Sequence, residues 1–342
     1  MKAVGLYKYL PIEDEQSLID VEIDCPKPTG RDLLVKVHAV SVNPVDTKVR
    51  TLNNKVETTP RVLGWDAAGE VIEVGPKVKS FAVGDPVYYA GDITRPGSNS
   101  EYQLVDERIV GKKPTTLSFE DAAALPLTSI TAWEGLFERL RISPNGEDAG
   151  KSILIIGGAG GVGSIAIQLA KKLGKLNVIA TASRPESIAW SKKLGADHVV
   201  NHRNPIDAEL IAIDTPQVDF ILCCNNTTQH WAAMAKAIAP QGGICSIVET
   251  PEPVELGLLK SKSATFVWEF MFTRSMYQTP DMIEQQRLLN KIADLVDEDK
   301  LVTTTNNVIR SINAKNLRKA HESIEQGNTI GKVVLADWPD EK

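Results

Sequence analysis

Three glycines with a fixed spacing are the residues of this chain whose types and positions point most directly to chemistry. Gly158, Gly160 and Gly163 form a G-x-G-x-x-G pattern, which follows the apolar run 153–156 and precedes a helix-like run over 164–173. A strand, a glycine turn and a helix start in this order form a dinucleotide-binding fingerprint, because backbone and helix N–H groups can reach a pyrophosphate there. The first glycine permits a tight turn, the second a close approach to phosphate, and the third close packing of helix on strand. We expect cofactor contacts from Gly158, Ala159, Gly160, Gly161, Val162 and Gly163.

The strand expected over 177–182 should carry the residue that meets the adenosine ribose, about 20 residues beyond the glycines. An NAD site would place Asp or Glu at the tip of this strand, but Ser183 and Arg184 stand there. A carboxylate would repel a 2′-phosphate, whereas Ser and Arg would bind one through charge-assisted hydrogen bonds. The sequence therefore favours NADP(H). The alternative is that Arg184 is a solvated residue near a helix start, since Pro185 suits the first helical position.

Length, charge and cysteine pattern favour a two-domain protein without nucleic-acid-binding or membrane-spanning segments. The chain has 342 residues and a net charge of −6, with charges of both signs mixed along it. We expect two domains from the length and no nucleic-acid partner from the charge pattern. The N-terminal residues lack a signal-peptide core, and no apolar run approaches the length of a membrane span. Four cysteines at unrelated spacings show no metal or redox pattern, so we expect free thiols in the cytoplasm: Cys25, Cys223, Cys224 and Cys245.

Two patterns of secondary structure divide the chain. Residues 1 to about 110 contain short strands separated by turn signals, over 33–42, 69–75, 83–89 and 101–105, which predict a small β-barrel-like domain. Ser118 with Asp121 resembles a capping-box helix start. Beyond it apolar strands alternate with amphipathic helices, which predicts a doubly wound, mostly parallel sheet and thus an α/β fold. Its strands are expected over 152–156, 178–182, 198–201, 220–224, 243–249 and 264–270. A last helix and strand, 315–326 and 331–336, should fold back on the first domain.

This order of elements and motifs resembles the medium-chain dehydrogenase/reductase superfamily. The resemblance rests on segments 63–71, 81–87, 122–133 and 194–197 together with the glycine turn. The Leu-Pro-Leu-Thr run with Thr-Ala-Trp resembles its quinone oxidoreductase branch, and segment 268–274 is similar to a bacterial subgroup called zinc-type alcohol dehydrogenase-like. The resemblance implies a GroES-like β-barrel domain over 1–122 and 308–342 and a Rossmann domain over 123–307. It also implies a cofactor and substrate in the cleft between them.

Some members of that superfamily bind zinc, and the residues at the ligand positions show whether this chain can do the same. Zinc-dependent members carry a Gly-His-Glu motif and a Cys in the loop after the third strand. This chain has Gly64-Trp65-Asp66 and, over 42–46, no Cys, and the segment 89–101 lacks the four cysteines of a structural zinc lobe. Indole does not ligate zinc, and catalytic zinc needs three N, S or carboxylate ligands. Asp46 and Asp66 alone are a poor zinc site, so we predict no metal.

Without a metal Lewis acid, reduction of a conjugated acceptor is easier than oxidation of an alcohol, because the developing enolate needs only hydrogen-bond donors or water. The resemblance implies that Asn43 donates to the oxygen of a carbonyl or quinone substrate, that Asp46 fixes the loop, and that Thr131 places the nicotinamide. Asn43-Pro44 is also a common turn dipeptide, which is compatible with a site. We expect Thr128 and Lys332 to be further cofactor contacts.

His202 follows the apolar residues 199–200, where quinone oxidoreductases often have Tyr near the adenosine phosphate. It could donate to a 2′-phosphate, and a surface-loop histidine is an equal alternative. The other four histidines have no partner pattern and are interpreted as structural: His38, His198, His230 and His321.

Four aromatic residues alternate along the end of the expected sheet: Phe266, Trp268, Phe270 and Phe272. They suggest a sheet edge that pairs across a homodimer, and a strand buried in the monomer is the alternative. The function expected from all these features is an NADP(H)-dependent reductase of quinones or α,β-unsaturated carbonyls. A zinc-dependent alcohol dehydrogenase and a catalytically silent NADPH-binding protein, as in lens crystallins related to this branch, are the alternatives.

Overall fold

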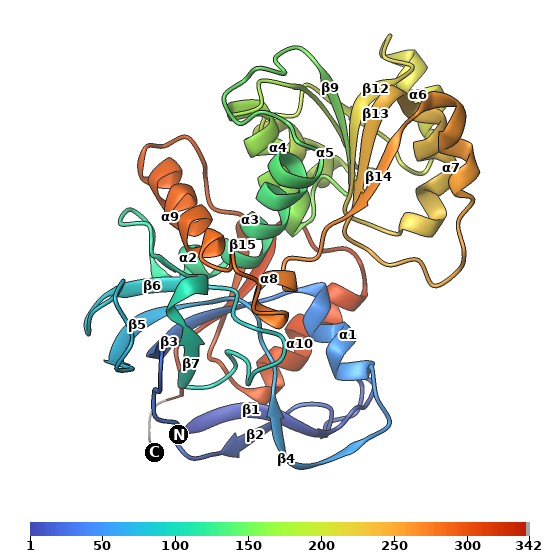
Figure 1. Ribbon diagram of the computed structural model, residues 1–342. Helices are drawn as coiled ribbons and strands as arrows, with labels where there is room; N and C mark the ends of the chain where they lie inside the picture. Colours follow the sequence, from blue (N-terminus) through green and yellow to red (C-terminus); the bar gives the residue numbers. More distant parts are fainter. Residues whose placement is uncertain (340–342) are drawn as a thin grey trace. The chain divides into compact units, whose positions relative to one another are not determined.

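The chain folds into two compact units, which a computed structural model describes over residues 1–339 (Figure 1). The first unit consists of Met1–Leu127 together with the chain from Phe272 on, and the second unit is Thr128–Met271. The expected Rossmann range, 123–307, is longer than the second unit at both ends. Residues 272–307 in particular belong to the first unit.

Helix α9 (Glu284–Asp297) explains why this stretch belongs to the first unit. Its apolar face is buried, and the backbone carbonyl of Leu289 accepts a hydrogen bond from the Tyr88 hydroxyl at 2.6 Å. Asn290 accepts the backbone N–H of Lys112 at 2.9 Å. An amphipathic helix belongs to the unit on which its apolar face packs. The alternation of strands and helices that precedes α9 along the chain therefore does not place it in the second unit.

The first unit is mostly β-structure, as its turn-rich sequence predicts. Its strands are β1 (Lys2–Lys8), β2 (Ile19–Glu22), β3 (Asp32–Val42), β4 (Val56–Val62), β5 (Ala67–Val74), β6 (Pro86–Tyr89), β7 (Tyr102–Asp106), β8 (Val110–Lys112), β15 (Thr305–Arg310) and β16 (Lys332–Ala336). One sheet has the order β2-β1-β4. The other has the order β15-β16-β3-β5-β6-β8, with β7 paired to β3. Its helices besides α9 are α1 (Pro44–Thr51), α2 (Phe119–Ala123), α8 (Thr273–Met276), α10 (Ala314–Glu325) and the short 3-10 helix Glu107–Ile109.

Three adjacent strands of the larger sheet, β16, β3 and β5, decide which polar residues meet. Val333 of β16 lies opposite Val42 of β3, and Ala67 of β5 lies opposite Val40. The residues just outside these pairs are Lys332, Asn43 and Asp66. Strand register therefore brings together, at one end of the sheet, residues that are up to 289 positions apart in sequence.

The second unit is a six-stranded sheet in which every strand pair is parallel. Its strands are β9 (Ser152–Ile156), β10 (Asn177–Thr181), β11 (His198–Val200), β12 (Val218–Cys223), β13 (Ile238–Ser246) and β14 (Thr265–Trp268). The order β11-β10-β9-β12-β13-β14 is the 3-2-1-4-5-6 order of a Rossmann fold, and it reverses between β9 and β12. The predicted doubly wound parallel sheet is confirmed.

Helices cover both faces of this sheet. They are α3 (Pro126–Trp133, which begins in the first unit), the π-helical turn Glu134–Arg139, α4 (Gly161–Lys172), α5 (Pro185–Lys193), α6 (Ile206–Ala212), α7 (Thr227–Ala237) and the 3-10 helix Leu256–Lys262. One core joins apolar side chains of α6 and α7, such as Leu210 and Met234, to the sheet residues Ile156 and Ile221. Among the described residues, no helix combines the length and the apolar character that crossing a bilayer requires.

The buried side chain of His321 on α10 should make the stability of the first unit depend on pH. The side chain is fully buried, and burial together with the nearby positive charge of Arg50 lowers the pKa of His321 to about 3. The unfolded chain binds a proton near pH 6.5 and the folded chain does not, so stability is lost as pH falls from about 6.5 toward 3. At pH 5 the loss is about 2 kcal/mol, at 1.36 kcal/mol per pKa unit.

Urea unfolding at pH 7.5 and pH 5.0 tests this prediction. For His321→Gln the difference between the two free energies of unfolding should shrink by about 2 kcal/mol relative to the unchanged protein. His198→Gln, at an exposed position, serves as the control and should leave the difference unchanged. An unaltered difference in the His321 variant would refute the assignment.

Candidate functional site

The glycine turn after β9 has the geometry of a phosphate-binding loop. Gly157, with φ of 83°, makes the tight left-handed turn, which we expected of Gly158. Gly158 instead allows close packing, since a Cβ there would lie 2.7 Å from the Cβ of Ala180. A Cβ on Gly163 would lie 2.3 Å from the carbonyl oxygen of Gly157, so this glycine permits the expected close approach of helix and turn. A Cβ on Gly160 would have one neighbour within 4 Å, the Gly157 oxygen at 3.4 Å, so its outer side is open to a ligand.

Helix α4 starts at this turn without a side-chain cap. Gly160 is its N-cap residue and has no side chain to accept the first N–H groups. The first N–H groups of a helix have no partner within the helix, and they carry its positive partial charge. Gly161 and Val162 are partly exposed, whereas Ala159 is buried. The turn therefore offers backbone donors to an anion, as the sequence predicts.

The carboxyl ends of β10 and β11 add cationic and polar groups beside this turn. The hydroxyl of Thr181, at the end of β10, accepts the Gly157 N–H at 3.0 Å. Ser183 and Arg184 follow, and Arg184 is the N-cap residue of α5 with Pro185 as its first residue, so the expected position at a helix start is observed. Its contact with a 2′-phosphate stays a prediction. Because β9, β10 and β11 are adjacent parallel strands, residues after each of them share one edge of the sheet.

His202, after β11, lies in the same cationic region. Its pKa is lowered by burial and by the positive charges of Arg203 and Arg184. Both charges that act on His202 are positive, and Glu186 is exposed on α5. Arg203 was not predicted as a site residue, although its position beside His202 is a signal. Ser183, Arg184, His202 and Arg203 together provide donors suited to a phosphate group.

In the first unit, Asn43, Asp66 and Lys332 form a buried polar cluster, which we call the Asn43 cluster. Asp66 Oδ2 accepts the Lys332 ammonium at 2.9 Å and the Asn43 amide at 2.8 Å, and its Oδ1 accepts the backbone N–H of Leu127 at 2.7 Å. Burial raises the pKa of Asp66, and these donors act against the rise. Lys332, which we predicted as a cofactor contact, donates to three oxygen acceptors within its own unit. Strand register produces this arrangement and no sequence signal reveals it.

Asp46 closes the first turn of α1 beside the Asn43 cluster. Its Oδ2 accepts the backbone N–H of Asn43 at 2.6 Å, and Asn43 is the N-cap residue of the helix. Burial raises the pKa of Asp46 to about 7, and the Asn43 N–H and the charge of Lys332 act in the opposite direction. This contact suits the loop-fixing role expected of Asp46.

Thr128 and Thr131 lie on α3 in the second unit, and both are buried. The π-helical turn Glu134–Arg139 follows and places Glu134 near Glu269. Arg139 Nε lies 2.8 Å from Glu269 Oε2. Burial and the neighbouring Glu134 raise the pKa of Glu269 to about 9. Sequence patterns did not reveal this acidic pair, because the two carboxylates are brought together only by packing of β14 on the π-helical turn.

The donor set of the first unit does not fit zinc. Trp65, at the position of the histidine in the Gly-His-Glu motif, is buried and donates its indole N–H to the Asp92 carbonyl at 3.4 Å. Asp66 is already paired with the Lys332 ammonium, which would repel a metal cation. Across residues 1–339, no group of three or more His, Cys, Asp or Glu side chains is arranged to hold a metal ion. Catalytic zinc needs three such ligands.

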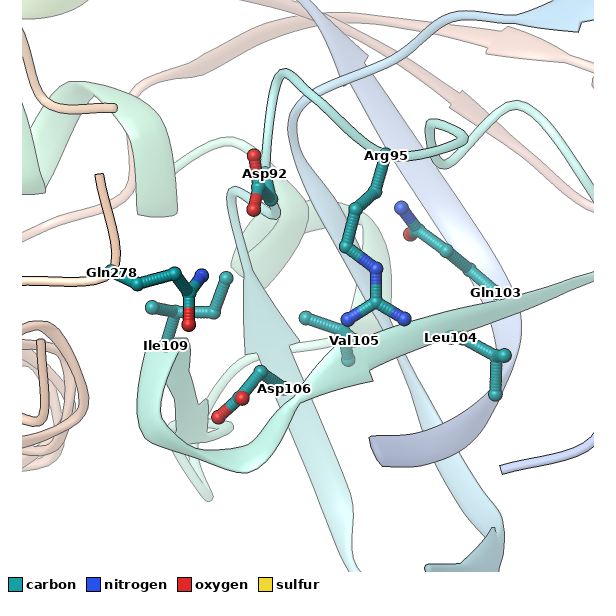
Figure 2. Close-up of a pocket in the computed structure, with 8 residues that line it drawn as sticks. All are labelled: Asp92, Arg95, Gln103, Leu104, Val105, Asp106, Ile109 and Gln278. Atoms are coloured by element: carbon teal, nitrogen blue, oxygen red, sulfur yellow. The ribbon is translucent and has the colours of Figure 1, made fainter. Parts of the chain in front are cut away.

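Segment 89–101, where a structural zinc lobe would lie, is held by polar contacts instead. Arg95 pairs with Asp32 at 2.8 Å, and Thr94 donates to Asp92 through both its N–H (2.8 Å) and its hydroxyl (2.7 Å). Figure 2 shows the cavity beside this segment, with Arg95, Asp92 and Asp106 among its lining residues. Its volume is about 100 Å³, which is too small for a typical substrate pocket of about 300–1,000 Å³.

Two known protein families match segments of the chain. The family described as alcohol dehydrogenase GroES-like domain matches residues 29–115, and the family described as zinc-binding dehydrogenase matches residues 194–335. The first match confirms the GroES-like assignment of the N-terminal domain.

Individual relatives cover almost the whole chain. A zinc-type alcohol dehydrogenase-like protein of Staphylococcus aureus is 46% identical over 336 residues, which are 98% of this chain and 99% of that protein. A crystal structure from Rhizobium etli, described as that of a candidate zinc-dependent alcohol dehydrogenase, is 51% identical with a TM-score of 0.95, and the match covers 99% of both chains. The quinone oxidoreductase of Escherichia coli, solved in complex with NADPH, is 25% identical with a TM-score of 0.82, over 98% of this chain and 100% of that chain. The chain therefore belongs to the medium-chain dehydrogenase/reductase superfamily of oxidoreductases and has quinone oxidoreductase-like relatives.

Proposed function

We propose that this protein is an NADP(H)-dependent reductase of quinones or α,β-unsaturated carbonyls that works without a metal. The observation that carries the proposal is the Asn43 cluster, in which the Asp66 carboxylate is paired with a lysine ammonium and an amide. Bound NADPH would supply a hydride. The protein's task is then to bind the dinucleotide, orient the substrate and donate hydrogen bonds to the oxygen on which charge develops.

The second unit would hold the cofactor. The turn from Gly158 to Gly163 and the N-terminus of α4 suit the pyrophosphate. Ser183, Arg184 and His202, together with Arg203, suit a 2′-phosphate, because the positive charges of Arg203 and Arg184 both act on His202. Thr128 and Thr131 of α3 are proposed to help place the nicotinamide.

Asn43 is the proposed donor to the substrate oxygen. Its amide nitrogen carries two hydrogens, of which one has a short contact with Asp66 at 2.8 Å. The other has two long contacts, with the carbonyl oxygens of Trp65 at 3.3 Å and Ser41 at 3.4 Å. Contacts of that length are at the outer limit of hydrogen bonding, so a substrate oxygen could replace them at little cost.

A screen of NADPH oxidation against quinones, enones and aldehydes, with metal analysis of the same sample, tests this function. We expect turnover with quinones or enones, no stoichiometric zinc, and unchanged activity in the presence of a chelator. One tightly bound zinc per chain together with alcohol oxidation would identify a zinc-dependent dehydrogenase. NADPH binding without any turnover would identify a catalytically silent binding protein.

We also propose that the protein is a homodimer that pairs along β14. This strand ends the order of the parallel sheet among the described residues, and Trp268 and Phe270 on it and just beyond it are each 47% exposed. Phe266 packs inward on Trp231 at a ring distance of 5.2 Å, and Phe272 is buried in the first unit, so Trp268 is the exposed aromatic residue of the strand itself.

Light scattering after size-exclusion chromatography checks the dimer. The unchanged protein should have twice the chain mass, and Trp268→Lys should yield a monomer, because a charge on a sheet edge opposes pairing. Tyr277→Lys, at an exposed aromatic residue of the first unit, is the control and should remain dimeric. A monomeric unchanged protein, or a dimeric Trp268→Lys variant, would contradict this interface.

The four cysteines are free thiols in the structure. A reducing compartment keeps thiols in this state, which supports our proposal of a cytoplasmic location.

A further inference from the structure

Lys332 is a buried lysine whose ammonium group is fully occupied by protein oxygens. Its side chain is 3% exposed and that of Asp66 is 0% exposed. The ammonium donates to the Val42 carbonyl at 3.1 Å, to Asp66 Oδ2 at 2.9 Å and to Asn43 Oδ1. An ammonium has three hydrogens, so these three acceptors satisfy it.

The ammonium also determines which way the Asn43 amide faces. Asn43 Oδ1 accepts from Lys332, and Asn43 Nδ2 donates to Asp66. A flipped amide would point its NH₂ group at the ammonium and its oxygen at the carboxylate, and both contacts would be repulsive. The opposite charges on Lys332 and Asp66 therefore allow one orientation of the amide, with its hydrogens on the Asp66 side.

The carboxylates near the ammonium depend on its charge. Asp66 accepts N–H groups at both oxygens, which is the environment of an ionised carboxylate. Asp46 is the other acidic group close to Lys332, and Asp66 acts on it with the same sign of charge. Two buried carboxylates, Asp66 and Asp46, therefore both feel the charge of the Lys332 ammonium at this end of the sheet.

We propose that Lys332 is a positioning residue, a built-in cation that keeps Asp66 ionised and aims the Asn43 amide hydrogens. In this role the ammonium is a fixed positive charge held by three oxygen acceptors. The kinetic consequence rests on the proposed function, whereas the consequences for stability and pH dependence do not.

Removal of the charge tests the role. Lys332→Met keeps the length of the side chain but leaves Asp66 without its counter-ion, so we expect the Tm to fall by about 5–15 °C. The stability of this variant should fall further as pH rises, because Asp66 must then ionise alone. In the double variant Lys332→Met with Asp66→Asn, most of the lost Tm should return, and the additional fall in stability with rising pH should disappear. Lys36→Met, at an exposed lysine of β3, is the control and should behave like the unchanged protein.

Chemical rescue provides a second, independent readout. Lys332→Ala leaves a space lined by the oxygens of Val42, Asn43 and Asp66, which methylammonium can fill with three N–H donors. Methylammonium chloride should raise the Tm of this variant, whereas tetramethylammonium chloride at the same concentration, which lacks N–H donors, should not. If the protein reduces enones, kcat should recover in parallel with the Tm.

A Lys332→Met variant as stable as Lys36→Met would overturn the proposal. So would a double variant no more stable than Lys332→Met, or equal effects of the two ammonium salts on Lys332→Ala. If the unchanged protein reduces neither quinones nor enones, the proposed function fails, but the Tm measurements still decide the role of Lys332.

Discussion

Arg184→Ala is expected to reduce the preference for NADPH over NADH by about 1.5–3 kcal/mol, or roughly 10- to 150-fold, the range for a hydrogen bond to a charged group. Arg184 follows β10 at the edge of the sheet that carries the glycine turn, and its charge acts on His202. A 2′-phosphate placed there would gain a charge-assisted hydrogen bond from the guanidinium. NADH lacks this phosphate, so its affinity should change little.

Fluorescence titration with both cofactors measures this preference. Lys192→Ala removes one positive charge from the exposed side of α5, and it should leave the ratio of the two dissociation constants unchanged. Equal affinity of the unchanged protein for NADPH and NADH would contradict the assignment of the cofactor. If Arg184→Ala retains the full preference for NADPH, residues other than Arg184 bind the 2′-phosphate.

Asn43→Ala is expected to lower kcat and kcat/KM together for enone or quinone reduction. A hydrogen bond to the substrate oxygen strengthens as charge develops on it, so its loss raises the barrier to the chemical step. Loss of one oxyanion donor costs about 10²–10³ in rate, and we expect a smaller but clear fall where water can replace the amide. NADPH affinity should stay within about twofold, because Asn43 belongs to the first unit and the dinucleotide fingerprint to the second.

Steady-state kinetics and NADPH titration of the same variant separate the two roles considered for Asn43. Asn53→Ala, at an exposed loop position of the same unit, is the matched control and should keep the unchanged rate. Unaltered kcat in Asn43→Ala would leave Asn43 as the turn residue at the start of α1 only. Loss of cofactor binding instead of kcat would equally exclude the donor role.

The second unit could be predicted from the sequence because its signals are local. Short apolar runs such as 152–156 are typical of buried strands in a parallel sheet, and they can be recognised without knowing which strands are their neighbours. The glycine turn and the capping residues mark where helices begin. Ser118 accepts the Asp121 N–H at 3.2 Å, as the capping pattern predicts. Strand ends depend on pairing with neighbouring strands. β13 begins at Ile238 rather than at Gly243, because its pairing with β12 starts before the glycines.

The Asn43 cluster could not be predicted, because its contacts are long-range. Lys332 and Asp66 are 266 residues apart, and they meet only because β16 and β5 flank β3 in a particular register. A shift of one residue in that register would turn Lys332 to the other face of the sheet. The domain limit near 272 was missed for a similar reason, since α9 has an ordinary amphipathic pattern that does not specify which sheet it covers.

The measurement that tests the central claim most directly follows deuterium from NADPH labelled at the transferable position of C4 into a simple enone, cyclohex-2-en-1-one. We expect that the purified, chelator-treated protein oxidises the cofactor and that NMR finds the deuterium on the β-carbon of the saturated ketone. Deuterium on the carbonyl carbon of an alcohol product, or activity that appears only when zinc is added, would contradict it.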